Sequence, residues 1–236
     1  MKILIVYAHP EPRSFCGALL QLSLATLRGA GHEVEVSDLY AQRFDPVGDR
    51  RDFTGQADPD FFKYQAEQLH AQRTHGFSAD VAAEQKKLLW CDLVIFLFPL
   101  WWFSVPAIMK GWFDRVLAMG YAYGGGRWYE HGPLVPRRAM IAMTAGAPQE
   151  RYREGNIFGG IEHVLYPLHI GVLNLVGLAV HEPFIAWGAA RVGPEVRAGY
   201  LFDWEARLTA IADEAPLPMH RIADHPDPYG GTQPLK

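Results

Sequence analysis

The sequence of 236 residues contains only two cysteines, Cys16 and Cys91. Two cysteines cannot form the disulfide framework of a small secreted domain, so we expect a cytoplasmic protein in a reducing compartment. There is also no excess of positive charge, because 22 Lys and Arg residues stand against 26 Asp and Glu residues. This balance argues against nucleic acid or an anionic membrane as the main partner.

A long uninterrupted apolar segment is absent as well. The uncharged run between Asp92 and Lys110 is shorter than the roughly 20 residues of a spanning helix, and it contains Pro99 and Pro106. The apolar stretch near the N-terminus is too short for a signal peptide. We therefore expect a protein that is not integral to a membrane. With 49% hydrophobic residues, the chain can form one full-sized core, although two small domains remain an alternative.

The sequence instead alternates short β-rich segments with segments of helical periodicity. Strands are expected at residues 2–8, 32–37, 93–98, 138–144 and 178–186. Helices are expected from Ser14 to Gly29 and at 60–73, 78–90, 105–119, 160–176 and 194–212, with a kink at Pro167. Residues 38–59 and the tail 216–236 have little periodicity. Five strands alternating with helices predict an α/β fold with a doubly wound parallel sheet.

In such a sheet, ligands bind beyond the carboxyl ends of the strands, where the strand order reverses. The loops at 9–16, 99–105 and 144–158 follow three of the expected strands. The candidate site is therefore sought in these loops.

The first of these loops runs His-Pro-Glu-Pro-Arg-Ser-Phe-Cys from His9 to Cys16. The N-terminus of the following helix suits a phosphate, to which Ser14 can donate its hydroxyl and Arg13 or protonated His9 can add charge. Alternatively, Ser14 only caps the helix and His9 is an ordinary loop residue. The glycine fingerprints of Rossmann and P-loop sites are absent from this loop. A lowered thiol pKa is possible for Cys16 at the helix N-terminus.

The second loop contains three consecutive aromatic residues, Trp101, Trp102 and Phe103. They cannot all face one core directly after a strand, so some of them are expected to form the wall of a cleft. A planar heteroaromatic ligand would use both their flat faces and the backbone N–H groups. The alternatives are an aromatic plug under a loop and a dimer contact.

Several long motifs resemble the NAD(P)H:quinone reductases of the DT-diaphorase type. They are YAHPEPRSF, SDLYAQRFDP, AAEQKKLLWCDLVIFLFP, FPLWWFSVPAIMKGWFDRV, YAYGGGRWYEHGPL and GVLNLVGLAVHEPF, and the resemblance runs from about residue 2 to 215. It implies a flavodoxin-like, three-layer αβα domain over residues 1–215 with a five-stranded parallel sheet, followed by the irregular tail 216–236. It also implies a tightly bound FAD, with FMN less expected, and an obligate homodimer with two active sites at the interface.

The resemblance also implies site residues. The FAD diphosphate and ribose would be lined by His9, Ser14, Phe15 and Cys16, which Arg13 of the same loop joins. The isoalloxazine would be held by Leu100, Trp101, Trp102 and Phe103, and its other edge by Thr144, Ala145, Gly146 and Ala147. Arg197 matches a position near the adenylate, and Tyr152 a position near the pyrimidine end. Tyr152 and Gly146 are the expected catalytic residues. Tyr123 of the partner subunit would cover the nicotinamide or quinone, together with Trp102 and Phe103.

The chemistry implied by the resemblance is a two-electron, ping-pong hydride transfer. NADPH or NADH would reduce the flavin, and a quinone or another planar small molecule would then take the hydride in the same place. No residue is a clear clamp for a 2′-phosphate, so the preferred donor stays open. Longer family members carry a C-terminal domain linked to NAD(P)H use, and this sequence ends at Lys236.

The sequence departs from the family pattern at three positions. Phe158 occupies the position of a histidine that acts with the tyrosine in a proton relay; His163, five residues on, is an alternative if the loop is shifted. Gly125 replaces a second cleft tyrosine, and Lys63 replaces a glutamine of the FAD-binding set. We expect an altered relay and a more open wall on the partner's side.

Other functions and sites are weighed against the enzyme. A flavin-bearing regulatory subunit of a membrane transport system could use residues 38–59 and the tail as a docking surface, and a flavodoxin-type carrier would transfer single electrons. Neither His220 nor His225 has a spacing that predicts a metal site, so no metal is expected.

Overall fold

The strand β1 (Lys2–Tyr7) lies inside a parallel sheet of a computed structural model that describes residues 1–227. It pairs with β2 (Glu33–Asp38) on one side and with β3 (Leu93–Pro99) on the other. β4 (Arg138–Ala145) and β5 (Ala179–Val180) complete the order β2-β1-β3-β4-β5, and β6 (Phe184–Trp187) also pairs with β4. The predicted doubly wound, flavodoxin-like sheet is confirmed. The chain adds β2 on one side of β1 and β3 on the other, so the strand order reverses between β1 and β3.

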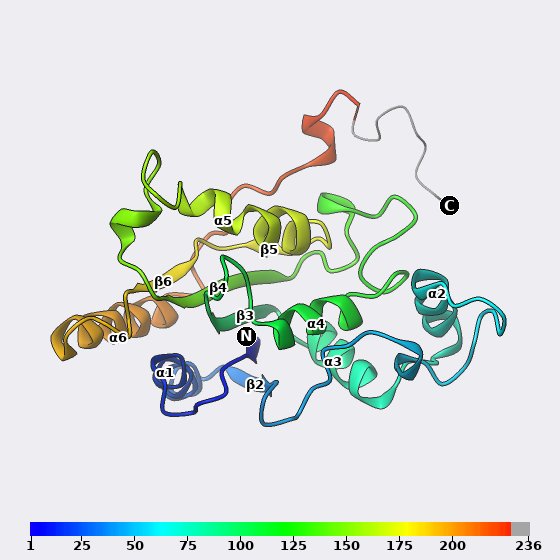
Figure 1. The fold of residues 1–236 in the computed structure, drawn as a ribbon, viewed down its shortest axis with the longest axis horizontal. Helices are drawn as coiled ribbons and strands as arrows, with labels where there is room; N and C mark the ends of the chain where they lie inside the picture. The colour runs from blue at the N-terminus through cyan, green and yellow to red at the C-terminus, as the bar shows by residue number, and fades with distance from the viewer. Residues whose placement is uncertain (228–236) are drawn as a thin grey trace.

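Helices cover both faces of the sheet (Figure 1). Because successive side chains of a strand point to opposite faces, each central strand contributes apolar residues to two core clusters. Ile3, Ile5 and Tyr7 of β1 pack in one core cluster with α1 (Phe15–Gly29) and α6 (Pro194–Thr209). Leu4 and Val6 pack in the other, with α3 (Ala79–Trp90), α4 (Ala107–Val116) and α5 (Ile161–Leu168). The prediction of three layers is consistent with this arrangement.

The fifth predicted strand, 178–186, is wrong as a single strand. β5 and β6 both pair with β4, but the register shifts by one residue between Ala139↔Val180 and Ala142↔Phe184. Pro183 lies in the interruption and has no N–H to donate to the ladder. The extra residue is accommodated there, so β6 still ends beside β4 at Trp187.

Three predicted helices have different limits. α2 (Tyr64–Thr74) begins after residue 60, because the Asp58 carboxylate accepts the N–H groups of Asp60 and Phe61 in a separate turn. α4 is shorter than 105–119, and Gly120 takes a left-handed turn (φ +87°) after it. The predicted helix 160–176 is α5, which contains Pro167, followed by the π-helical turn His169–Asn174.

Short turns complete the described chain. Four are 3₁₀ turns, at Arg50–Asp52, Tyr129–His131, Gln149–Tyr152 and Ile222–Asp224. The irregular segment 38–59 is fixed by the buried Arg115, whose guanidinium contacts the carboxylates of Asp52 and Asp80 at 2.8 Å each. It also donates to the Asp45 carbonyl at 2.7 Å.

The described part of the tail lies on the protein surface. Leu217 N donates to the Val180 carbonyl, and the Glu130 carboxylate accepts the N–H groups of Ile222 and Ala223. The remainder of the predicted tail, 228–236, lies outside the described residues. The domain boundary at residue 215 stays a prediction.

Within residues 1–227, no helix is both long and apolar enough to cross a membrane. Over the same residues, no group of three or more His, Cys, Asp and Glu side chains is arranged to hold a metal ion. Both cysteines are free and buried, and Cys91 lies in the core.

His181 makes the fold sensitive to acid. The ring of His181 is fully buried, and its Nδ1 lies 3.1 Å from Glu214 Oε1. Burial lowers the pKa of His181 below the ordinary value of 6.5. The Glu214 carboxylate opposes this shift, and the positive charges of Arg138 and Arg207 reinforce it. Because the unfolded chain takes up this proton first as pH falls, the stability is full above pH 6.5 and decreases below it. His181→Asn, which retains an N–H near Glu214, is therefore expected to lose less of its melting temperature than the wild type between pH 7.5 and 5.5. Equal losses in thermal unfolding would contradict this; His75→Asn, at an exposed position, is the matched control.

Candidate active site

Thr144, near the end of β4, joins the three loops that were predicted to form the site. Its carbonyl accepts the Leu100 N–H at 2.8 Å, which fixes the loop after β3. Its Oγ1 lies 3.3 Å from Cys16 Sγ, at the start of α1. The ends of β1, β3 and β4 therefore meet at one place, where the strand order reverses.

The first loop exposes the N-terminus of α1. Ser14 caps this helix as one of the two interpretations predicted, accepting the Gly17 N–H at 3.1 Å through Oγ. Because Oγ accepts this bond, the hydroxyl proton is left for a different acceptor, and the Tyr7 hydroxyl oxygen lies within its reach. The loop packs so closely on the helix that a Cβ at Gly17 would lie 1.9 Å from the Pro12 carbonyl oxygen.

Burial favours the neutral form of the His9 ring over the cation considered from the sequence. Burial lowers its pKa, and its Nδ1 accepts the Glu11 N–H at 3.0 Å. With Nδ1 occupied as an acceptor, the neutral ring carries its proton on Nε2. The ring lies 6.3 Å from that of Trp101, between centroids, so it connects the first loop with the aromatic loop.

A cleft of about 430 Å³ opens at the N-terminus of α1. Seven of the predicted residues line it: His9, Arg13, Ser14, Phe15, Cys16, Thr144 and Arg197. Arg197 Nη1 donates to the Val192 carbonyl at 2.8 Å, and the exposed Arg13 pairs with Glu11 at 3.1 Å. Two cations and a helix N-terminus thus surround one cleft, which is favourable for a phosphorylated ligand.

The possibility of a reactive Cys16 thiolate is wrong. The side chain is buried, and burial raises the pKa of its thiol to about 11. Desolvation outweighs the helix N-terminus here, so Cys16 stays protonated at neutral pH.

The aromatic loop is a tight backbone turn. The N–H and C=O groups of Trp101 and Ser104 bond to each other at 3.0 Å, and both intervening residues have positive φ, 51° at Trp102 and 57° at Phe103. Trp102 is 97% exposed. The prediction that some of these aromatics leave the core is consistent with this geometry.

A second aromatic group lies beside this turn. The Tyr152 ring is 5.1 Å from that of Phe158 and 5.2 Å from that of Trp187, and Phe103 is 5.2 Å from Phe158. Burial raises the pKa of Tyr152, which keeps its hydroxyl neutral. Ala145 and Ala147 pack in the same cluster, whereas Gly146 is exposed and has open space beside it.

No histidine side chain replaces Phe158 as the neighbour of Tyr152 within the described residues. His163 is exposed, and its Nδ1 lies 3.7 Å from Glu154 Oε2, so the shifted-loop alternative is not supported. Phe158 contacts Tyr152 directly, as the position of the family's histidine suggested.

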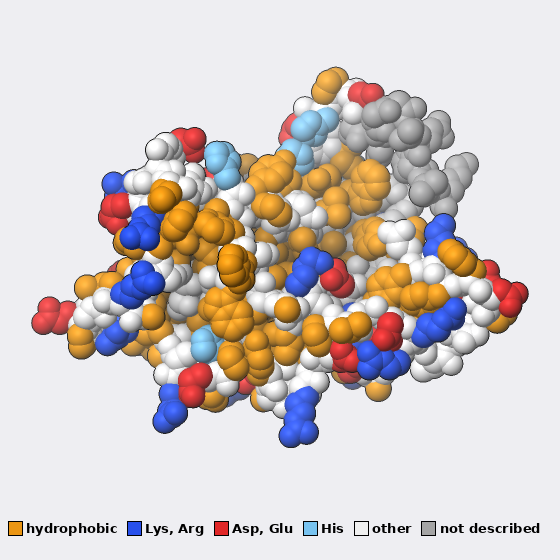
Figure 2. Space-filling view, in the orientation of Figure 1, with side chains coloured by type: hydrophobic (Ala, Val, Ile, Leu, Met, Phe, Trp, Pro, Cys, Tyr) orange, Lys and Arg blue, Asp and Glu red, His pale blue; other side chains and the backbone are white. Residues whose placement is uncertain are grey.

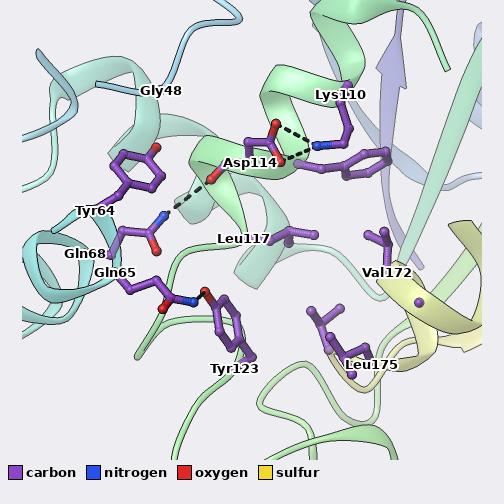
Figure 3. A pocket seen from close by; sticks show the side chains of 13 residues that line it. Gly48, Tyr64, Gln65, Gln68, Lys110, Asp114, Leu117, Tyr123, Val172 and Leu175 are labelled. Atoms are coloured by element: carbon purple, nitrogen blue, oxygen red, sulfur yellow. Dashed lines mark hydrogen bonds and ion pairs between the residues drawn. The ribbon is translucent and has the colours of Figure 1, made fainter. Parts of the chain in front are cut away.

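Tyr123 does not line the cleft at α1. It lies in a separate cavity of about 530 Å³ between α2, α4 and the π-helical turn (Figure 3). Lys63 also belongs to this side of the molecule, directly before α2. Gly125 takes a left-handed φ of 61°, and no atom lies within 4 Å of the position that its Cβ would occupy.

Sequence reasoning missed Ala18 of the cleft, on α1, and three residues near β6. Ala189 and Ala190 line the cleft, and Trp187 contacts Tyr152. All three follow or end β6, whose carboxyl end lies beside that of β4. The rule that ligands bind at strand ends would have found them, had the fifth strand been placed to end at residue 187.

A model of the family described as the flavodoxin-like fold matches residues 1–208. The chain belongs to this family. It is 42% identical over 217 residues to NAD(P)H dehydrogenase [quinone] 1 of Cavia porcellus, covering 92% of this chain and 79% of that protein. It is 40% identical over 218 residues to ribosyldihydronicotinamide dehydrogenase [quinone] of Homo sapiens, covering 92% and 94%.

Solved structures of the family agree with this placement. A Klebsiella pneumoniae protein described as a candidate quinone reductase has a TM-score of 0.91 and 40% identity, covering 96% of this chain and 90% of that chain. An NAD(P)H:quinone oxidoreductase from Methanothermobacter marburgensis has a TM-score of 0.70 and 26% identity, covering 90% and 97%. The resemblance to quinone reductases deduced from the sequence is confirmed.

The backbone turn at Trp102 is strained, because residues other than glycine rarely adopt a positive φ. A non-glycine residue in the left-handed region costs about 1–2 kcal/mol, and the exposed indole makes few contacts in return. Trp102→Gly is therefore expected to raise the melting temperature of the flavin-free protein by about 2–4 °C. Phe202→Gly, a second exposed aromatic but in the helix α6, should lower it. A lower melting temperature for Trp102→Gly would show that the indole packs on something that stabilises the fold.

Proposed function

We propose that this protein is an FAD-dependent NAD(P)H:quinone oxidoreductase. The overall reaction would be NAD(P)H + H⁺ + quinone → NAD(P)⁺ + hydroquinone, through two hydride transfers of a ping-pong mechanism. One observation carries the proposal: a cationic cleft at the N-terminus of α1 adjoins an aromatic turn at the switch point of the sheet. The names of the two curated relatives support the same activity.

The residues present fit a flavin nucleotide. Ser14, His9 Nε2–H and the first turn of α1 are donors for a diphosphate, with Arg13 and Arg197 as countercharges. The cleft extends from the helix N-terminus to Ala189, Ala190 and Arg197, which leaves room for a nucleotide beyond the first phosphate. This extent favours FAD over FMN, the ligand named for a Treponema denticola structure with 26% identity and a TM-score of 0.60.

When bound, the flavin would supply the hydride acceptor and donor of the reaction. The residues of this chain would bind and orient the flavin ring. Leu100, Trp101, Trp102 and Phe103 would hold the ring, with Thr144, Ala145, Gly146 and Ala147 at its other edge. Gly146 leaves space for a planar group to approach the backbone. Tyr152, neutral and packed against Phe158, would donate a hydrogen bond at the edge of the site without a histidine partner.

A homodimer completes this proposal. Figure 2 shows hydrophobic side chains gathered over the middle of one face. The large hydrophobic residues that are exposed in the described chain include Trp101, Trp102, Phe103, Ile157 and Tyr166. Such a concentration of exposed apolar area is typical of an interaction surface. Tyr123 lies outside the chain's own cleft, so it would reach the nicotinamide or quinone only in the partner's site. Two buried, free cysteines agree with a cytoplasmic location.

The hydride donor is proposed to be NADPH or NADH. The Homo sapiens relative is named for ribosyldihydronicotinamide, so that compound belongs in the same assay. The relatives are named as dehydrogenases, which supports an enzyme in preference to a regulatory subunit of a membrane transport system.

The test is the identity of the bound flavin and the steady-state pattern. Protein purified without added cofactor should release one FAD per chain on acid treatment, identified by chromatography and mass. Initial rates at several quinone concentrations should give parallel double-reciprocal lines. Protein that carries no flavin and takes none up on reconstitution would overturn the proposal.

A further inference from the structure

The cavity that holds Tyr123 has one polar wall and one apolar wall (Figure 3). Leu117, Val172 and Leu175 form its apolar side, and Gln65 and Tyr123 meet across its polar side. Lys110 and Asp114 also line it, but they form an ion pair with each other at 2.6 Å. The cavity is therefore suited to a flat, largely apolar molecule that carries a few polar atoms.

Gln65 determines whether the Tyr123 hydroxyl donates or accepts its next hydrogen bond. Gln65 Nε2 donates to Tyr123 Oη at 3.0 Å, although the two residues are 58 positions apart. A phenol has one proton to donate, and its oxygen is here engaged as an acceptor. Its O–H is consequently free to donate to a third group. Accepting a hydrogen bond also polarises the hydroxyl and strengthens it as a donor.

Neighbouring hydrogen bonds fix the segments that carry Gln65 and Tyr123 relative to each other. Gln68, one turn after Gln65 on α2, is buried; its Nε2 donates to the Asp114 carbonyl at 3.3 Å and its Oε1 accepts the Met119 N–H at 3.0 Å. Met119 in turn forms a β-bridge with Tyr123. α2 and the Tyr123 turn are thus tied together through the same amide side chain. The bond between Gln65 and Tyr123 is set by packed elements on both sides.

We propose that Gln65 is a positioning residue for the electron acceptor. It holds the Tyr123 hydroxyl so that its O–H donates a hydrogen bond to a carbonyl oxygen of a quinone-type acceptor. This inference rests on the proposed function, in which Tyr123 covers the site of the partner subunit. No proton leaves Tyr123; the hydroxyl orients the acceptor and favours those with a carbonyl oxygen within its reach.

Three variants test this proposal in the flavin-loaded protein. Gln65→Leu removes the amide at similar volume, Gln65→Glu retains an acceptor without the N–H, and Tyr123→Phe removes the hydroxyl. Gln21→Leu, at an exposed position of α1, is the matched control. Each variant is assayed with a benzoquinone, and with ferricyanide, which takes single electrons and has no carbonyl oxygen. The rate of flavin reduction by the nicotinamide is measured separately by stopped flow.

Gln65→Leu and Tyr123→Phe are each expected to lower kcat/KM for the quinone about tenfold, mainly through KM, because one hydrogen bond of orientation is lost. The double variant should lose no more than either single one, because both remove the same bond to the acceptor. Gln65→Glu should resemble Gln65→Leu. Reoxidation of the pre-reduced flavin by ferricyanide should be unchanged, and the control variant should behave like the wild type.

Additive losses in the double variant, or a Gln65→Leu protein that behaves like the control, would overturn this inference. An equal loss with ferricyanide would do the same, because it would show a general structural effect. Failure of the proposed function would look different: the wild-type flavin would not be reduced by a nicotinamide, or the quinone would not reoxidise it.

Discussion

Gly17→Ala is expected to weaken FAD binding at least about a hundredfold while the protein remains folded. The added Cβ would lie 1.9 Å from the Pro12 carbonyl oxygen, so the loop that carries Arg13 and Ser14 must move away from α1. A misplacement of about 1 Å can cost a factor of a hundred in the rate of a reaction between positioned groups, and we expect a loss of the same order for FAD binding. Titration of the flavin-free protein with FAD, followed by flavin fluorescence, measures the loss.

Gly29→Ala, at the other end of α1, is the control for this experiment. No atom lies within 4 Å of its Cβ position, so it should bind FAD as the wild type does. Circular dichroism of both variants should show the wild-type helix content. Unchanged FAD affinity in Gly17→Ala would mean that the close approach of this loop to α1 has no role in binding.

Phe158→His is expected to raise quinone turnover about tenfold or more. General acid–base catalysis typically contributes 10²–10⁴-fold, and Phe158, whose ring lies 5.1 Å from that of Tyr152, cannot carry a proton. An imidazole in its place would add a titratable group beside the Tyr152 hydroxyl. The pH profile of kcat should then gain a transition near the ordinary histidine pKa of about 6.5.

Phe158→Gln separates polarity from proton transfer. Its amide can form a hydrogen bond with Tyr152 but does not titrate, so it should show neither the faster turnover nor the new transition. Unchanged or slower turnover in Phe158→His would show that water or another group already supplies the proton in the wild type.

The sequence predicted the sheet well because its signal is local. The run 2–8 is apolar on both faces, and Ser14 directly precedes a helical periodicity; both features can be recognised within ten residues. His181, Glu182 and Pro183 interrupt the apolar run 178–186, and a proline inside a central strand could have indicated the break. The one-residue shift against β4 could not be predicted, because it is a long-range pairing. Similarly, the start of α2 depends on a side chain, Asp58, that competes for the backbone N–H groups.

The candidate site shows the same limit. Strand ends located the three loops, and seven predicted residues line one cleft. The charge states were less predictable: Cys16 and His9 depend on burial, which a sequence pattern does not report. The bond between Gln65 and Tyr123 joins residues with no shared motif and follows only from the packing of α2 against the Tyr123 turn.

An anaerobic titration of the purified protein tests the central claim most directly. Flavin absorbance is followed while NADPH, NADH or dihydronicotinamide riboside is added in separate experiments, and a benzoquinone is then added to the reduced protein. We expect one donor to bleach the flavin rapidly and the quinone to restore it fully, without a stable semiquinone. A bound flavin that no donor reduces would contradict the oxidoreductase, and a stable semiquinone would favour a one-electron carrier.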